Sequence, residues 1–144
     1  MNIERALKEL SSDRLKILRR SSFYETEPRD LRAQPWFLNI AVEIETSLFP
    51  RQLLARIASI ETAMGRRRTV AKGPRTIDVD IVFFGRFVID TPPGLVIPHP
   101  RMHERRFMLE PLAELAPDLR HPVFKKTVRE MLGTVRDQDV RRLE

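Results

Sequence analysis

The sequence predicts a single α+β domain. Helical and strand-like hydrophobic periodicities alternate along the chain, and no internal repeat or linker divides it. Its 144 residues suit one hydrophobic core. Hydrophobic residues make up 42% and charged residues 32% of the chain, which is typical of a folded globular protein and excludes a disordered one. We therefore expect residues 1–144 to form one domain.

The first half of the chain contains two predicted helices and two predicted strands. Residues 2–10 place apolar side chains at helical spacing, and β-branched and aromatic residues favour a strand over residues 15–26. Residues 27–36 contain two prolines and are typical of a loop. Strict alternation over residues 38–45 predicts a strand with one buried face. Residues 50–64 return to helical spacing, with a proline at the start and a glycine just after the end.

The second half begins with a predicted hairpin and ends with predicted helices. Apolar alternation indicates a strand over residues 76–84, a turn at residues 85–86 and a return strand over residues 87–90. A proline-rich connection then leads to a helix over residues 104–115, and a last short helix is expected over residues 127–132. Strands and helices therefore interleave to the end of the chain.

Composition also excludes several classes of site. The chain has no cysteine, which excludes disulfides, thiolate nucleophiles and zinc–sulfur centres. No apolar run approaches the ~18 residues that a membrane span needs, and the first residues lack the layout of a signal peptide. We expect a cytoplasmic protein with no membrane partner.

The net charge of +6 comes largely from two basic segments. Residues 66–75 contain five basic residues and no acidic one, and residues 101–106 form a second basic group interrupted by Glu104. For a basic run alone, a solvated face is the more frequent explanation, and nucleic-acid binding is another. The sequence that follows the first segment favours a third explanation.

Asp78 and Asp80 lie in the predicted strand that follows the first basic segment. In a strand they project to one face, about 7 Å apart, and repel by about 2 kcal/mol at an effective dielectric near 20. A hard divalent cation compensates such a pair, and oxygen donors without cysteine or clustered histidine favour Mg²⁺. An exposed edge strand is the alternative, but Val82 and Phe84 continue the same face, so that face is not simply solvated.

The neighbouring arginines suit a polyphosphate ligand bound beside Mg²⁺. The chain has no Walker A sequence and only five glycines, so backbone amides of a glycine-rich loop do not hold the phosphates. If a nucleotide binds, arginine side chains and a metal must hold its phosphates instead. Phosphoryl-type transfer needs alignment and charge neutralisation more than covalent chemistry from the protein.

Five ordered stretches resemble the bacterial hydroxymethyl-dihydropterin pyrophosphokinase family. They are residues 21–28, 34–39, 65–68, 73–81 and 98–107, and they cover nearly the whole chain. This family transfers pyrophosphate from ATP to the hydroxymethyl group of 6-hydroxymethyl-7,8-dihydropterin in folate biosynthesis, releasing AMP. The resemblance implies a ferredoxin-like α+β fold, a sandwich of a mostly antiparallel sheet with helices, in which loops close over the substrates.

The resemblance also implies roles for residues on the ATP side. Asp78 and Asp80 correspond to the residues that hold two Mg²⁺ ions, and Arg66 and Arg75 match the two arginines tied to catalysis. The positions that correspond to ATP contacts are Glu61, Arg68, Arg75, Ile81, His99 and Arg105.

Four further positions match the pterin pocket of the family. Phe37 and Phe107 correspond to aromatic rings that sandwich the flat pterin, and Asn39 corresponds to an amide that binds its edge. Thr26 lies where the family uses backbone groups for the pterin. Each of these residues has a plain structural alternative in the core or on the surface, and their joint spacing favours the pocket.

The sequence departs from the family pattern at three places. The family opens with a strand and a Gly-Ser-Asn turn ahead of the helix that Met1 begins here, so we expect the first strand to be missing and hypothesise that the sequence starts at an internal methionine. Lys72 replaces an aromatic residue and Ala71 a basic one. A glycine is replaced within residues 29–30, which stiffens that loop.

Two alternatives to a pyrophosphokinase stay open at this point. One is a catalytically weakened homologue that binds nucleotide or pterin, and the other is a basic nucleic-acid-binding domain. The small supply of aromatic residues argues against nucleic acid. A monomer is expected for the family, and a dimer becomes possible if a second protomer supplies the missing strand.

Overall fold

The computed structural model describes residues 2–26, 37–65 and 77–143. Within these ranges four α-helices and seven strands are interspersed along the chain. The strands form three small antiparallel sheets. This mixture confirms the predicted α+β class and is consistent with the ferredoxin-like fold that the resemblance implies. No helix in the described ranges is both long and apolar enough to cross a membrane.

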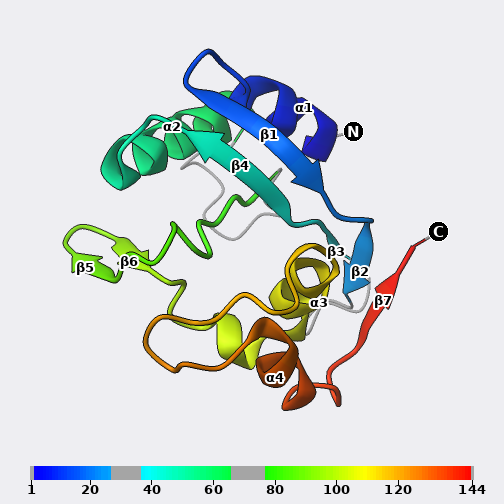
Figure 1. Cartoon of the computed structure of the whole chain (residues 1–144). Helices are drawn as coiled ribbons and strands as arrows, with labels where there is room; N and C mark the ends of the chain where they lie inside the picture. Colours follow the sequence, from blue (N-terminus) through cyan, green and yellow to red (C-terminus); the bar gives the residue numbers. More distant parts are fainter. Residues whose placement is uncertain (1, 27–36, 66–76, 144) are drawn as a thin grey trace.

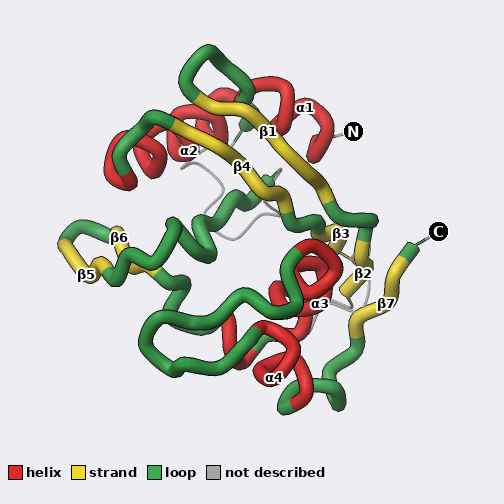
Figure 2. Tube along the Cα trace, in the orientation of Figure 1, coloured by secondary structure: helices red, strands yellow, loops and turns green. Residues whose placement is uncertain are grey.

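Figures 1 and 2 show two groups of helices with the β1–β4 ribbon beside one of them. The elements in chain order are α1 (Asn2–Leu10), β1 (Leu15–Arg20), β2 (Tyr24–Thr26), β3 (Phe37–Asn39), β4 (Val42–Thr46), α2 (Pro50–Ala63), β5 (Ile89–Thr91), β6 (Leu95–Ile97), the 3-10 helix η1 (Met102–Glu104), α3 (Arg106–Leu115), α4 (Val128–Gly133) and β7 (Val140–Arg142).

The first group packs α1 and α2 with the antiparallel pair β1–β4. Helical spacing brings the apolar side chains of each helix onto one face, and these faces meet the inner side of the strands. Pro50 begins α2, as predicted, and Gly65 follows the helix with a φ of +104°, a conformation that glycine adopts without strain. The buried residues of this first cluster are Ala6, Leu10, Leu15, Leu53, Ile57, Ile60 and Met64.

The second group packs η1, α3 and α4 around a separate cluster. The Thr127 side chain caps α4 by accepting a hydrogen bond from Glu130 N–H at 3.1 Å, and the Glu130 side chain accepts one from Thr127 N–H at 2.9 Å. The predicted helices over residues 104–115 and 127–132 are therefore confirmed. The buried residues of the second cluster are Met102, Leu109, Val128, Met131, Leu132 and Val135.

A three-stranded sheet of order β3-β2-β7 lies beside α3. Thr26 of β2 pairs with Phe37 of β3, and Tyr24 pairs with Arg142 of β7. The C-terminal strand β7 is not among the predicted elements, because three residues with two arginines show no strand periodicity. Its pairing joins the end of the chain to β2.

Two predicted strands are each divided into two. Residues 15–26 form β1 and β2, and residues 38–45 are divided between β3 and β4. The chain leaves the regular ladder at Ser21, whose hydroxyl accepts a hydrogen bond from Ala41 N–H at 2.9 Å, while Ser21 N–H donates to Ala41 O at 2.9 Å. This side-chain acceptor replaces a backbone one, and the strands change direction there.

The predicted strand over residues 76–84 is wrong in its described part, residues 77–84. These residues belong to no sheet among the described ranges. A strand requires a neighbouring backbone for its ladder, and alternation in the sequence does not reveal whether that neighbour exists. The predicted turn at residues 85–86 is confirmed, but the return strand over residues 87–90 is instead β5, which pairs with the unpredicted β6.

Candidate active site

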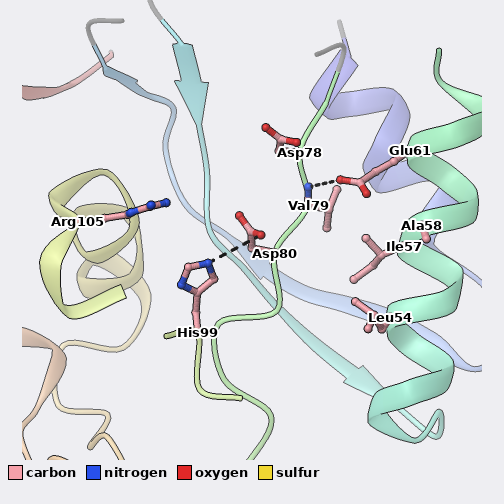
Figure 3. A pocket seen from close by; sticks show the side chains of 9 residues that line it. All are labelled: Leu54, Ile57, Ala58, Glu61, Asp78, Val79, Asp80, His99 and Arg105. Carbon is pink, nitrogen blue, oxygen red and sulfur yellow. Dashed lines mark hydrogen bonds and ion pairs between the residues drawn. The ribbon is translucent and has the colours of Figure 1, made fainter. Parts of the chain in front are cut away.

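A cavity of about 360 Å³ lies between α2, residues 77–84 and the loop before α3 (Figure 3). We call residues 77–84 the acid segment. The cavity brings together residues of three separate parts of the chain, including five titratable side chains. Its lining residues are Leu54, Ile57, Ala58, Glu61, Asp78, Val79, Asp80, His99 and Arg105.

Residues 77–82 keep the alternation that the sequence predicts, although they belong to no sheet in the described ranges. Asp78 and Asp80 are exposed, whereas Ile77, Val79 and Ile81 are partly buried against the first cluster. In Figure 3 both carboxylates project toward the side of His99 and Arg105, while Val79 points toward α2. The two predicted metal ligands therefore share one face, and the intervening apolar side chains hold the opposite face against the core.

Beyond Val82 the alternation ends, because Phe83 packs against the second cluster and Phe84 against the first. The prediction that Phe84 continues the face of the two aspartates is therefore wrong, whereas Val82 does lie away from the first cluster.

Glu61 joins α2 to the acid segment. Its Oε2 accepts a hydrogen bond from Val79 N–H at 2.9 Å, and the residue is only 7% exposed. The helical spacing of apolar residues places Ile57 and Ile60 in the first cluster, so packing fixes the helix that carries Glu61. Glu61 is a predicted ATP-side residue, and the structure places it at the cavity.

His99 faces Asp80 across the cavity. Its Nε2 lies 4.0 Å from Asp80 Oδ1, and its Nδ1 accepts a hydrogen bond from Arg101 N–H at 3.1 Å. Because Nδ1 is an acceptor, the neutral ring carries its proton on Nε2, toward the carboxylate. Burial lowers the pKa of His99 below its ordinary value; Asp80 opposes this shift, and Arg105 and Arg101 add to it.

Arg105 connects the cavity to α3. It lies at the start of that helix, lines the cavity, and places its guanidinium carbon 5.6 Å from the ring centroid of Phe107. This is a cation–π distance. The predicted ATP residue Arg105 and the predicted pterin residue Phe107 are therefore in contact.

The other predicted pterin residues lie together on β2 and β3. Asn39 Nδ2 donates a hydrogen bond to Thr26 Oγ1 at 2.9 Å, and Thr26 pairs with Phe37 across the two strands. Phe37 is 52% exposed, which is unusual for a large aromatic side chain and leaves its ring open to a flat ligand. Helix α3, which carries Phe107, packs against both strands.

A second cavity of about 240 Å³ adjoins the first, because the two share Leu54, Val79, Asp80 and His99. Ile81 lines this cavity together with β6. Leu54 and β6 are cavity components that no pattern in the sequence predicts. Leu54 follows the same apolar pattern as the core residues of α2, so nothing in the sequence distinguishes it as a cavity residue.

Three predicted site residues, Arg66, Arg68 and Arg75, lie outside the described residues, as do the departures at Ala71 and Lys72. The structure therefore brings together Glu61, Asp78, Asp80, His99 and Arg105 at one cavity. It brings Thr26, Phe37 and Asn39 together on β2 and β3.

The donor set of the cavity fits a hard divalent cation. Within the described ranges no cluster of three or more histidine, aspartate or glutamate side chains is arranged to hold a metal ion. Mg²⁺ does not require such a cage, because it usually takes one or two protein carboxylates and completes its shell with water and substrate phosphates. Asp78 and Asp80, both exposed and on one face, supply that kind of incomplete shell.

An α+β fold with paired carboxylates opposite an arginine and a histidine defines a protein suited to a metal-bound phosphorylated ligand. Residues 1–117 match the family model described as 7,8-dihydro-6-hydroxymethylpterin-pyrophosphokinase (HPPK). The chain therefore belongs to this family.

Named relatives agree with the family match. A 2-amino-4-hydroxy-6-hydroxymethyldihydropteridine pyrophosphokinase of Methylorubrum extorquens is 44% identical over 131 residues, which is 90% of this chain and 80% of the relative. A protein of the same name from Bacillus subtilis is 54% identical over 95 residues, 66% of this chain and 56% of the relative.

Other relatives are much longer than this chain. The folic acid synthesis protein fol1 of Pneumocystis carinii is 40% identical over 136 residues, which is 94% of this chain but 18% of the relative. The chain likewise spans 17% of the fol1 protein of Schizosaccharomyces pombe.

Proposed function

We propose that this chain transfers the pyrophosphoryl group of ATP to the hydroxymethyl group of 6-hydroxymethyl-7,8-dihydropterin and releases AMP. One observation carries the proposal: the cavity with Asp78, Asp80, His99 and Arg105 is linked through the Arg105–Phe107 contact to the helix that packs on β2 and β3. A cavity whose charges suit a metal-bound phosphate and an aromatic, amide-bearing surface are therefore connected through α3. The family match and the named pyrophosphokinases support the same reaction.

In the proposed reaction the substrate hydroxyl oxygen attacks the β-phosphorus of ATP. The bond from that phosphorus to the oxygen bridging the α-phosphate breaks, and AMP leaves with this oxygen and its electron pair. The hydroxyl proton is released. Such a step requires in-line positioning and stabilisation of spreading negative charge rather than a protein nucleophile.

Asp78 and Asp80 are proposed to hold the metal. Mg²⁺, when bound there, would neutralise part of the triphosphate charge. Arg105 supplies a fixed positive charge at the same cavity, and His99 in its neutral form can donate its Nε2 proton to a phosphate oxygen. The family resemblance adds Arg66, Arg68 and Arg75 as phosphate contacts. Two bound Mg²⁺ ions remain a prediction.

The pterin is proposed to lie against β2 and β3. Phe37 offers an exposed ring face, and Phe107 extends from α3, which packs on these strands. Asn39 uses one Nδ2 hydrogen for Thr26, so its Oδ1 can accept from the ring edge. A flat ring held between aromatic faces and bound at its edge is the arrangement that these residues favour.

Several further expectations stay predictions. They are the single domain over residues 1–144, the monomeric state with a dimer as its alternative, the cytoplasmic location, and the absence of nucleic-acid and membrane partners.

The proposed function is tested by incubating the protein with ATP, Mg²⁺ and hydroxymethyl-dihydropterin and measuring AMP. We expect AMP rather than ADP, and formation that depends on the pterin. Asp78→Asn and Asp80→Asn should each lower the rate by at least about 100-fold, because one metal ligand is lost. Asp139→Asn, on the exposed connection to β7, is the matched control and should leave the rate unchanged.

Two outcomes would contradict the proposal. ADP formed without pterin would indicate another phosphotransferase. Nucleotide binding without AMP formation by the parent protein would indicate a homologue that binds without turnover.

A further inference from the structure

We propose that Glu61 is a positioning residue for the acid pair: its carboxylate fixes the backbone between Asp78 and Asp80 and so aims both side chains into the cavity. This inference rests on the proposed function, in which that pair holds a metal-bound nucleotide. It gives Glu61 a role that acts through the acid segment rather than through direct contact with ATP.

The anchor is a rigid one. Glu61 is 7% exposed, and its Oε2 lies 2.9 Å from Val79 N. Ile57 and Ile60, one turn before and one residue before Glu61, are buried in the first cluster. A hydrogen bond to an ionised carboxylate is roughly twice as strong as one between neutral groups. Helix α2 therefore holds the acid segment by a strong bond from a well-packed platform (Figure 3).

The acid segment needs such an anchor because it belongs to no sheet in the described ranges. In a sheet, a ladder on each side would fix how the strand is rotated about its own axis. Here other contacts must fix this rotation. The structure shows two at the same residue: Val79 N–H bonds Glu61, and the Val79 side chain packs against the first cluster.

Fixing Val79 determines where its neighbours point. In extended backbone, side chains at alternate positions share a face, so Asp78 and Asp80 both lie opposite Val79. If the Val79 N–H lost its acceptor, the segment could rotate and the two carboxylates would no longer converge on one ion. His99 N–H donates to Val82 O at 2.9 Å and supports the segment further along, but not between the two aspartates.

Three substitutions separate position from charge. Glu61→Gln removes the charge but keeps an oxygen that can accept from Val79 N–H. Glu61→Asp keeps the charge but is one methylene too short to reach it. Glu61→Ala removes both. Thr62→Ala, an exposed neighbour on α2, is the control for effects on the helix itself.

The first measurement is the ¹H–¹⁵N spectrum of the metal-free protein. We expect the Val79 amide proton, now bonded to a carboxylate, to move upfield and to exchange faster in Glu61→Asp and Glu61→Ala. It should stay protected in Glu61→Gln and be unchanged in Thr62→Ala.

The second measurement is Mn²⁺ binding, followed by electron paramagnetic resonance in the presence of α,β-methylene-ATP. We expect affinity at least about tenfold weaker in Glu61→Asp and Glu61→Ala, and within about threefold of the parent in Glu61→Gln, as for residues that orient a metal ligand. Melting curves of all variants identify any that is unfolded, and the Gln–Asp contrast decides the matter if the alanine variant does not fold.

The possible failures are distinguishable. If Glu61→Gln binds Mn²⁺ as weakly as Glu61→Ala, the charge of Glu61 matters rather than its hydrogen bond. If Glu61→Asp binds Mn²⁺ as tightly as the parent protein, the reach of the side chain does not matter. Either result overturns the positioning role while the proposed function stands. If the parent protein itself takes up no Mn²⁺ with the nucleotide, both the function and the positioning role are overturned.

Discussion

The acid segment carries the proposed metal ligands and the β2–β3 pair carries proposed pterin residues, and the two are held in place by different forces. Strand β2 is bonded on both sides, to β3 and to β7. The acid segment belongs to no sheet, and Glu61, His99 N–H and apolar packing hold it instead. Backbone pairing tolerates changes of side chain, whereas single side-chain anchors do not. A single substitution should therefore displace the proposed metal ligands more easily than it unpairs β2 from β3.

The β2 region also has side-chain anchors, and Glu114 on α3 joins the most elements among those described. Its Oε1 accepts a hydrogen bond from Tyr24 Oη at 2.7 Å, and its Oε2 accepts from Ser22 N–H at 3.0 Å. Arg142 Nη2 of β7 lies 3.8 Å from the same carboxylate. This carboxylate therefore joins β2, β7 and the helix that carries Phe107.

The largest expected effect is that of Glu114→Ala. It leaves the buried Tyr24 hydroxyl and the Ser22 amide without this acceptor, so the free energy of unfolding should fall by about 2–3 kcal/mol. The measurement is urea denaturation. In the AMP assay, KM for the pterin should rise more than KM for ATP. Glu114→Gln, which keeps an acceptor, should lose less; equal losses in the two variants would argue that charge, not hydrogen bonding, dominates.

A smaller, pH-dependent effect is expected at His121, which supports the far end of the acid segment. The buried His121 ring lies edge-on to Phe83, with centroids 5.9 Å apart, and stacks on Phe124 at 4.2 Å. Its Nδ1 accepts hydrogen bonds from Val123 N–H at 3.1 Å and Phe124 N–H at 3.0 Å. Protonating Nδ1 would oppose both donors.

Burial lowers the pKa of His121 below its ordinary 6.5, and the neighbouring His103 lowers it further. The unfolded chain then binds the proton first, so stability is full above pH 6.5 and is lost as the pH falls through the window below it. His121→Asn keeps an acceptor for both amides and cannot titrate. We expect urea midpoints of the parent to fall between pH 7 and 5 more steeply than those of His121→Asn, with His99 titrating in both proteins. Parallel pH profiles would contradict this.

Glu114 titrates in a lower window. Burial alone would raise its pKa, but hydrogen bonds from Tyr24 and the Ser22 amide outweigh it, so the pKa of Glu114 lies below the ordinary 4.5. Its stabilisation is present above pH 4.5 and is lost as the pH falls below that value. On acidification, Phe83 and the acid segment should therefore loosen before β2 and α3 separate, which amide exchange at pH 5.5 can test residue by residue.

The smallest effect is expected from the ion pair between Arg141 of β7 and Glu25 of β2. The arginine side chain is 65% exposed, and the β2–β7 ladder remains when it is removed. Arg141→Ala should lower the free energy of unfolding by less than about 1 kcal/mol. Combining it with Glu25→Ala in a double-mutant cycle measures the pair itself. A coupling well above 1 kcal/mol would mean that side chains, not the ladder, hold β7.

Local periodicity in the sequence determined the helices over residues 2–10, 50–64 and 104–115, and the alternation that exposes Asp78 and Asp80. These features depend on side chains a few positions apart, so the sequence contains them directly.

Hydrogen-bond partners far apart in the chain were decided by the tertiary structure alone. Examples are β7 on β2, Glu114 on Tyr24 and Glu61 on Val79, together with the failure of residues 77–84 to join a sheet in the described ranges. Whether an extended segment becomes a strand depends on a neighbour that packing supplies, and a linear pattern does not carry that information.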